Sequence, residues 1–188
     1  DIVDGVGDAD ATLAILRERG VITVAGNHER WLLHDEMRHL ANCTPTLRPE
    51  NRAMLEGLPR TLRLPTIAGG AILCHAVGED DESFLRSTTR GYDLQIEALR
   101  ELMLDPSVQY MLAGHTHERM VRRFQGLVVV NAGTLRRDDS PGFIVVDFER
   151  KLVRCFDIGD LGARIEEREP LALPQPLPVP SLEDDDLY

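Results

Sequence analysis

The chain has 188 residues, enough for one domain with a sizeable hydrophobic core. Its composition, 43% hydrophobic and 28% charged residues, is typical of a soluble globular protein. The formal net charge of −11 argues against nonspecific binding to nucleic acid or to an anionic membrane. No apolar run approaches the roughly 18 residues of a transmembrane helix, and no signal peptide is visible.

The cysteines favour a reducing compartment. Cys43, Cys74 and Cys155 are widely spaced, and none belongs to a Cys-x-x-Cys pair. Cys74 ends an apolar run and is expected to be a small buried side chain. Together with the missing targeting signals, this pattern predicts a cytoplasmic location.

The first part of the chain predicts alternating helices and strands. Acidic residues at Asp8 and Asp10 and a glycine at Gly20 delimit a helix over residues 11–19. The continuous, β-branched run Val21–Ala25 predicts a buried strand. Further helices are expected at residues 31–40 and 50–56.

The second part is richer in strands. Residues 79–91 are polar and irregular, which predicts a flexible loop at the site, and residues 92–104 have the apolar spacing of a helix. Strands are expected at residues 61–64, 71–75, 110–113, 127–131, 142–148 and 152–157, the last two as a hairpin. This order predicts an α/β protein with a mixed β-sandwich flanked by helices, not a purely parallel doubly wound sheet.

The character of the chain changes near Glu166. Closely spaced prolines follow, and then the acidic run 183–186. Such a segment buries too little apolar surface to offset the entropy of ordering it. We therefore expect one domain over residues 1–165 and a Pro-rich acidic tail over residues 166–188 that is disordered or draped on the surface.

Four polar turns that follow apolar runs carry side chains able to bind metal. They are residues 1–5, 26–29, 74–76 and 114–117. Ligands collect outside the carboxyl ends of strands in open α/β sheets, so these turns are expected to converge. His115 and His117 stand at i and i+2, which would point both rings the same way on an extended chain. Carboxylate, amide oxygen and imidazole suit Mn, Fe, Ni, Co or Zn better than a structural zinc finger.

These turns resemble the motifs of the calcineurin-like metallophosphoesterase superfamily, in the family's order. Gly26-Asn27-His28-Glu29 and Gly114-His115-Thr116-His117 match two motifs, His75 matches the isolated histidine between them, and Asp1-Ile2-Val3-Asp4-Gly5 resembles Gly-Asp-x-x-Asp without its glycine. The resemblance covers residues 1–157. It implies the four-layer αββα fold of the compact bacterial phosphodiesterase-type members.

The resemblance also implies two divalent metal ions, with Mn as the first choice and Fe, Ni, Co or Zn as alternatives. Asp1 would bridge both ions, and Asn27, His75 and His115 would complete the shell of one. His117 would bind the other ion.

The same resemblance assigns the reaction. His28 would bind no metal but would act as general acid for the leaving oxygen or stabilise developing charge. A bridging hydroxide would attack a small phosphodiester or phosphomonoester. The expected partner is thus a small phosphate-ester substrate, with neither membrane nor nucleic acid. The sequence leaves the substrate, the native metal and the oligomeric state undetermined.

One family motif has no counterpart, because no Asp-x-His precedes Asp1. One ion would then keep four ligands and the other only Asp1 and His117. We expect a first strand-helix unit, on the order of 30 residues, to lie upstream, and a chain without it to be a poor two-metal catalyst. One alternative is a noncatalytic protein-interaction scaffold on the same fold. The other is a dinucleoside polyphosphate or protein phosphatase of the same superfamily. Such phosphatases tend to carry further arginine motifs, and only Arg30 follows the Gly-Asn-His-Glu motif here.

Several other residues have two readings. Asp4 is expected to serve its turn more than the site, and Arg119, Arg122 and Arg123 to form a solvated strand face more than a phosphate site. Glu29 either orients His28 or starts the next helix. Trp31 fits a pocket wall as well as a core, and Asn131 is expected either to pack below the site or to shape the pocket. Asp138 and Asp139 are expected in a solvated turn.

Overall fold

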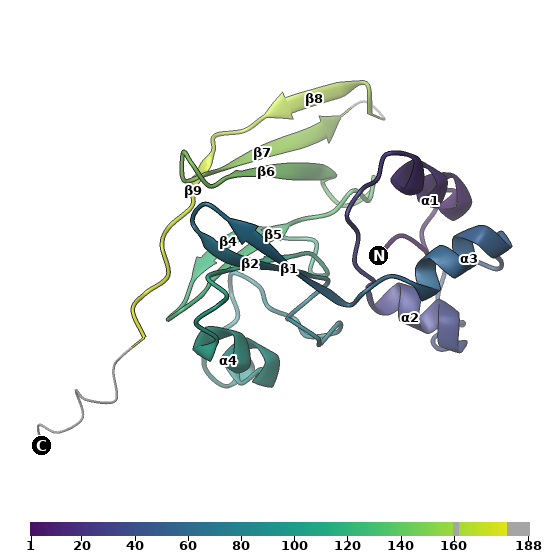
Figure 1. Cartoon of the computed structure of the whole chain (residues 1–188). Coiled ribbons are helices and arrows are strands. Elements are labelled where there is room, and N and C mark those ends of the chain that lie inside the picture. Colours follow the sequence, from purple (N-terminus) through teal and green to yellow (C-terminus); the bar gives the residue numbers. More distant parts are fainter. Residues whose placement is uncertain (160–161, 180–188) are drawn as a thin grey trace, which may run out of the picture.

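The computed structural model of the chain describes residues 1–159 and 162–179. Two β-sheets lie face to face, and helix α4 (Glu97–Leu104) covers the free face of the first sheet (Figure 1). Three helices gather at one end of the sheets, with the N-terminus beside them. They are α1 (Ala9–Glu18), α2 (Asn27–His34) and α3 (Pro49–Glu56). The expected α/β class with two sheets is therefore confirmed.

The first sheet has five strands in the order β1-β2-β3-β5-β4. Its three inner strands are parallel, and both edge strands run antiparallel to their neighbours. The strands are β1 (Thr61–Thr66), β2 (Gly69–Cys74), β3 (Tyr110–Ala113), β4 (Arg119–Arg123) and β5 (Val128–Ala132). Because β2 and β3 are parallel neighbours, the turns that follow them begin at the same edge of the sheet.

The second sheet is built on the hairpin expected near the C-terminus. Strands β6 (Gly142–Asp147) and β7 (Leu152–Gly159) pair antiparallel, as predicted. The far side of β7 pairs with β8 (Arg164–Glu167) and β9 (Leu171–Ala172). The described helices cover only the first sheet and one end of the sandwich, so within these residues the second sheet's outer face has no helical layer.

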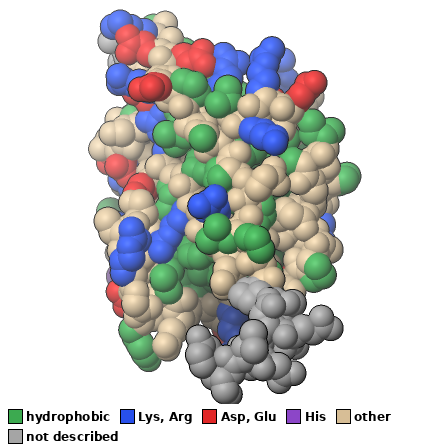
Figure 2. All heavy atoms as spheres, turned by 90° about the vertical axis from the view of Figure 1, so that its left-hand side faces the viewer, with side chains coloured by type: hydrophobic (Ala, Val, Ile, Leu, Met, Phe, Trp, Pro, Cys, Tyr) green, Lys and Arg blue, Asp and Glu red, His purple; other side chains and the backbone are tan. Residues whose placement is uncertain are grey.

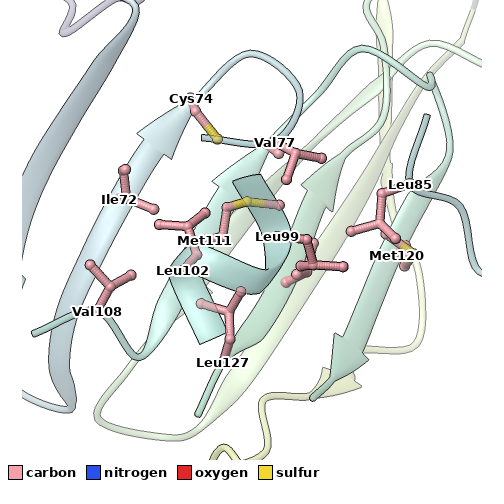
Figure 3. Close-up of a cluster of buried hydrophobic side chains, with 12 residues drawn as sticks. Ile72, Cys74, Val77, Leu85, Leu99, Leu102, Val108, Met111, Met120 and Leu127 are labelled. Carbon is pink, nitrogen blue, oxygen red and sulfur yellow. The ribbon is translucent and has the colours of Figure 1, made fainter. Parts of the chain in front are cut away.

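Alternation along the strands divides the core into two layers. In β2, Ile72 and Cys74 face helix α4, whereas Ala71 faces the second sheet. Figure 3 shows the layer under α4, where Leu99 and Leu102 of the helix meet the sheet. Successive side chains of β2 thus enter two different buried layers, which agrees with the period of two expected for strands. Cys74 is buried, as predicted.

The expected strand at residues 21–25 is wrong. This segment is extended but pairs with no described strand, and Val21 and Ile22 are 47% and 61% exposed. Its last residue, Ala25, donates a hydrogen bond to the carbonyl of Pro59. A β-branched run favours extended backbone, but burial also needs a neighbouring strand, and none of the described residues supplies it.

Two helices have different bounds from those expected. Helix α2 begins at Asn27, four residues before the expected start at Trp31, because the Glu29 carboxylate accepts a hydrogen bond from the N–H of Gly26, the N-cap residue. The expected helix over residues 92–104 is interrupted. A 3₁₀ turn, η1 (Gly91–Leu94), precedes α4.

The Pro-rich segment is partly ordered by pairing. Strands β8 and β9 both use residues of the expected tail, and Leu173 is buried between the sheets. This part of the chain is draped on β7, while the acidic run 183–186 lies outside the described residues. Within the described part, no helix has the length and apolar character needed to span a bilayer.

Candidate metal centre

Asp1, His75 and His115 meet at one point, with a ligand atom of each within 4.8 Å of the others. His75 Nε2 lies 3.2 Å from Asp1 Oδ1 and 3.1 Å from His115 Nδ1. A carboxylate oxygen and two imidazole nitrogens at this spacing form a donor set suited to a divalent transition metal. No His side chain is visible on the face of the molecule that Figure 2 shows.

The first sheet positions both histidines. His75 directly follows β2 and His115 nearly follows β3, so parallel pairing of these strands brings the two residues to one edge. The N–H of Gly114 donates to the carbonyl of His75 over 2.8 Å, which extends the pairing into the turns. His115 then takes a positive φ of 63° and turns its ring toward His75.

Helix α2 and its cap position Asp1. The buried carboxylate of Glu29 accepts hydrogen bonds from the N–H groups of Ile2 (2.6 Å), Val3 (3.1 Å) and Gly26 (2.7 Å). These bonds tie the segment carrying Asp1 to the start of the helix, and the N–H of His28 points at Asp1 Oδ1 over 3.4 Å. Glu29 therefore starts the helix and fixes Asp1. Within the described residues, no hydrogen bond joins Glu29 to His28.

Two buried atoms at the site lack any hydrogen-bond partner among the described residues. They are the Oδ1 atom of Asn27 and the Nε2 atom of His115. A buried polar atom without a partner is costly, and a metal ion satisfies an amide oxygen or an imidazole nitrogen directly. The Oδ1 atom of Asn27, a predicted ligand, therefore fits a cation. In His115 the Nδ1 atom, 3.1 Å from His75 Nε2, is the nitrogen that faces the cluster.

Gly26 leaves the room in which these groups meet. A β-carbon built on Gly26 would collide with Asp1 Oδ1 and lie 2.8 Å from His75 Nδ1. The backbone of Gly26 is extended, with φ −103° and ψ −176°, so its conformation does not demand glycine. The close approach of Asp1 and His75 is what requires a residue without a β-carbon at this position.

Burial keeps the two imidazoles neutral. It lowers the pKa of His75 to about 3 and, together with the neighbouring His75, lowers the pKa of His115 to about 4. Neutral imidazole has a free nitrogen lone pair at physiological pH, which is the form that binds metal. Burial also favours the neutral form of the Cys74 thiol, and for this acid it raises the pKa, to about 12.

His28 lies beside this cluster and is held by Asp4. Its Nδ1 atom is 3.2 Å from Asp4 Oδ2, and Asp4 also accepts two hydrogen bonds from Arg38 and one from the N–H of Thr44. Burial opposes the charge of Asp4, but these bonds outweigh it and lower the pKa of the carboxyl. Asp4 sits in a turn with φ 58°, as expected, and its contact with His28 also gives it the second role that was considered, a group that supports the site.

The structure does not bring His117 into the cluster. Its φ is 60°, and its Nδ1 atom contacts Asp139 Oδ2 at 2.8 Å. With positive φ at both His115 and His117, the turn is not extended, so the i, i+2 argument fails here. Asp139 is accordingly more than a solvated turn residue. The assignment of His117 as a ligand of a second metal stays a prediction.

Several side chains around the site have roles that the sequence did not settle. Asn131 lies below the turn that carries His115 and donates to Gly114 and Thr116. Arg119 forms an ion pair with Asp157 of the second sheet, and Arg122 bonds carbonyls of the loop before η1. The expected solvated strand face is therefore wrong for both arginines.

Arg30 is engaged by acidic groups. It bonds Asp81, Glu82 and Glu36, and hydrogen bonding to Asp81 in particular raises its pKa. Its guanidinium is thus not free for phosphate. Trp31 is half-buried, with its ring 4.6 Å from that of His28, so it stands at the wall of the site. Two further residues contact the site although no sequence motif marks them. Phe84 lies against His115, and Arg38 bonds Asp4.

The fold and the cluster define a two-sheet α/β protein with a candidate metal centre at the edge of its first sheet. Residues 1–151 match the family described as calcineurin-like phosphoesterase superfamily domain, so the chain belongs to the calcineurin-like phosphoesterase superfamily. A comparison with curated protein sequences finds no match.

One solved structure supports this fold, and two others align less closely. A double mutant of Vps29 from Entamoeba histolytica aligns with a TM-score of 0.50 and 18% identity, over 90% of this chain and 79% of that one. A single mutant of the same protein gives a TM-score of 0.42 and 17% identity over 62% of each chain, so the alignment spans less than two thirds of that protein. An archaeal phosphodiesterase aligns with a TM-score of 0.39 and 13% identity, over 79% of this chain and 90% of its own. At these identities the likeness shows the fold alone.

Proposed function

We propose that the chain is a metal-dependent phosphoesterase that hydrolyses small phosphodiesters or phosphomonoesters. The observation that carries the proposal is the convergence of Asp1, His75 and His115, together with an unpaired, buried Oδ1 atom on Asn27, the residue that follows Gly26. Four donors of this kind, two oxygens and two nitrogens, match the requirements of Mn²⁺ and its neighbours in the transition series. Membership of the phosphoesterase superfamily supports the reaction class.

In this proposal Asp1, Asn27, His75 and His115 hold one divalent ion, and Asp1 and His117 contribute to a second. Bound divalent ions would polarise the phosphoryl group and supply a nucleophile derived from water. For His117 to take part, its ring has to leave Asp139. The proposal therefore makes the second position the weaker one in this chain.

His28 supplies the proton for the leaving oxygen. Its Nδ1 atom is held by Asp4, which leaves Nε2 as the atom that faces away from that contact. With Nδ1 bonded to this carboxylate, Nε2 is the nitrogen left to give a proton to the leaving oxygen. Trp31, against the same imidazole, limits how the ring can turn.

The partner in this proposal is a small phosphate ester, with no membrane and no nucleic acid, in keeping with the net charge of −11. A cytoplasmic location belongs to the same proposal. A noncatalytic scaffold is the competing function, and metal-stimulated turnover separates the two.

The test compares His115→Ala with His39→Ala. Calorimetric titration with Mn²⁺ measures binding, and release of p-nitrophenol from bis-p-nitrophenyl phosphate measures turnover. We expect His115→Ala to weaken Mn²⁺ binding by more than about tenfold, because a ligand is removed, and to abolish metal-stimulated turnover. His39 is exposed, and its side chain makes no hydrogen bond, ion pair or ring contact with the cluster among the described residues. Its alanine variant should therefore match the wild type.

Two results would contradict the proposal. One is the absence of Mn²⁺-stimulated hydrolysis by the wild-type protein at every pH between about 5 and 9. That result, with Mn²⁺ binding intact, would favour the scaffold. The other is equal Mn²⁺ affinity in His115→Ala and the wild type, which would remove the metal centre itself.

A further inference from the structure

Two aromatic side chains lie against imidazoles of the candidate metal centre. The ring of Trp31 is 4.6 Å from that of His28, and the ring of Phe84 is 4.7 Å from that of His115. The backbone of His28 and the imidazole of His115 stand at the ends of one series of contacts. This series runs from the N–H of His28 to Asp1, from Asp1 to His75 and from His75 to His115. An aromatic ring therefore stands at each end of the metal centre.

Phe84 is held in an exposed position by its neighbours. Its side chain is 58% exposed, whereas Leu85 is buried in the core layer under α4. Just before it, Asp80 caps the turn by accepting from Glu82 and Ser83. Core packing on one side and the capped turn on the other fix where Phe84 can point.

The same loop is bonded to helix α2. Arg30 donates to Asp81 and Glu82, and the indole Nε1 of Trp31 donates to Glu82 over 3.0 Å. The two aromatic rings are thus linked through Glu82, which lies two residues before Phe84. The loop expected to be flexible is tied down at the point where it reaches the site.

A cation accompanies Phe84. The guanidinium of Arg86 lies over the ring of Phe84, 5.6 Å from its centroid. Among the described residues no carboxylate lies within ion-pair distance of Arg86. In a chain with a net charge of −11, a guanidinium left free beside a metal centre favours an anionic ligand.

We propose that Phe84, with Trp31 and Arg86, selects phosphate esters that carry a flat aromatic group, of which nucleotides are the main biological class. The inference rests on the proposed function, because the phosphate would lie at the metal centre. The ring of Phe84, which is 58% exposed, stacks on the base once Arg86 moves from the ring to the phosphate, since a purine or pyrimidine offers a π face to any aromatic ring. Arg86 contacts the phosphate, and Trp31 borders the other end of the site.

The experiment uses the fluorescence of Trp31, the single tryptophan of the chain. The Mn²⁺-loaded protein is titrated with AMP and, separately, with ribose 5-phosphate, which lacks the base. We expect AMP to change the emission saturably and to bind more tightly than ribose 5-phosphate. Phe84→Leu should weaken AMP about fivefold or more, the effect of losing one base–aromatic stack, and should leave ribose 5-phosphate unchanged.

Two variants serve as controls. Phe84→Tyr keeps the ring and should keep the affinity for AMP. Tyr92→Ala removes an exposed aromatic side chain from the next segment of the chain. Among the described residues its ring contacts none of the imidazoles of the site, so this variant should behave as wild type.

Equal binding of AMP and ribose 5-phosphate would overturn the inference, as would a Phe84→Leu variant that weakens both ligands equally. In either case Phe84 would only shield His115 from water. Failure of the proposed function has a different signature. AMP would still bind in a Phe84-dependent way, but no phosphate ester would be hydrolysed.

Discussion

At the scale of single residues, the candidate site depends on a buried carboxylate that binds no metal. Glu29 accepts three backbone N–H groups, two from the segment after Asp1 and one from Gly26. Its charge is stabilised by these bonds despite full burial, and without them it would be a costly unpaired group. The metal-competent oxygen of Asp1 is therefore placed by the helix cap.

Gly26→Ala tests how tightly this geometry is constrained. The new methyl group would collide with Asp1 and lie 2.8 Å from His75 Nδ1. We expect Mn²⁺ affinity to fall by about tenfold or more, because a displacement of one ligand changes the coordination geometry. Calorimetric titration measures the affinity.

Gly57→Ala is the matched control. Its β-carbon would meet only backbone oxygens at 3.6 Å, an ordinary contact, at the end of α3. If Gly26→Ala bound Mn²⁺ as tightly as the control, the ligands would be able to move aside, and the site would be less preorganised than the structure indicates.

The sequence identifies the residues of the site better than their contacts. His75 and His115 follow strands in recognisable motifs, and the structure brings both to Asp1. His117 has the same motif support, but its position depends on a left-handed backbone that no residue type there requires. Phe84 belongs to no motif, and only the fold places it against His115.

At the scale of elements, a turn after one strand is braced from the neighbouring strand. Asn131, near the end of β5, donates to the carbonyl of Gly114 and to the hydroxyl of Thr116. Its own Oδ1 atom accepts from the N–H of Gly133 over 2.9 Å. One buried amide thus holds the turn that carries His115, across the parallel pair β3 and β5.

Asn131→Ala should therefore affect both stability and metal binding. Loss of these buried hydrogen bonds is expected to cost about 1 to 3 kcal/mol in the free energy of unfolding. Asn51→Ala is a matched control, because Asn51 is equally buried and bonded, but to Asp10 and Arg17 in the helical part. Urea unfolding should show a loss for both variants, whereas Mn²⁺ affinity should fall only for Asn131→Ala. Equal affinities would show that the turn keeps its shape without the brace.

The same scale shows what periodicity can and cannot predict. The apolar runs predict strands β2, β3 and β5, and the structure gives each of them a neighbouring strand on both sides. Val21–Ala25 has the same composition but no described neighbour, and it stays unpaired. Composition reports what a segment prefers, while sheet formation depends on a partner far away in sequence.

At the scale of the whole molecule, the Pro-rich segment joins the two sheets. Leu171 and Ala172 pair with β7, and Leu173 is buried between the sheets. Further on, Leu177 exchanges hydrogen bonds with the turn between β4 and β5, through Phe124 and Gly126. Prolines that predict disorder are compatible with this path, because an extended edge segment needs few of its N–H groups.

The contribution of this segment is measurable through two neighbouring leucines. Leu173 is 3% exposed and Leu171 is 41% exposed, although both lie on the same segment. Leu173→Ala should lower the free energy of unfolding by about 2 to 3 kcal/mol, since it leaves a cavity in the layer between the sheets. Leu171→Ala should change it by no more than about 0.5 kcal/mol. Urea denaturation of both variants measures the difference, and equal costs would mean that the segment lies on the surface without closing the sandwich.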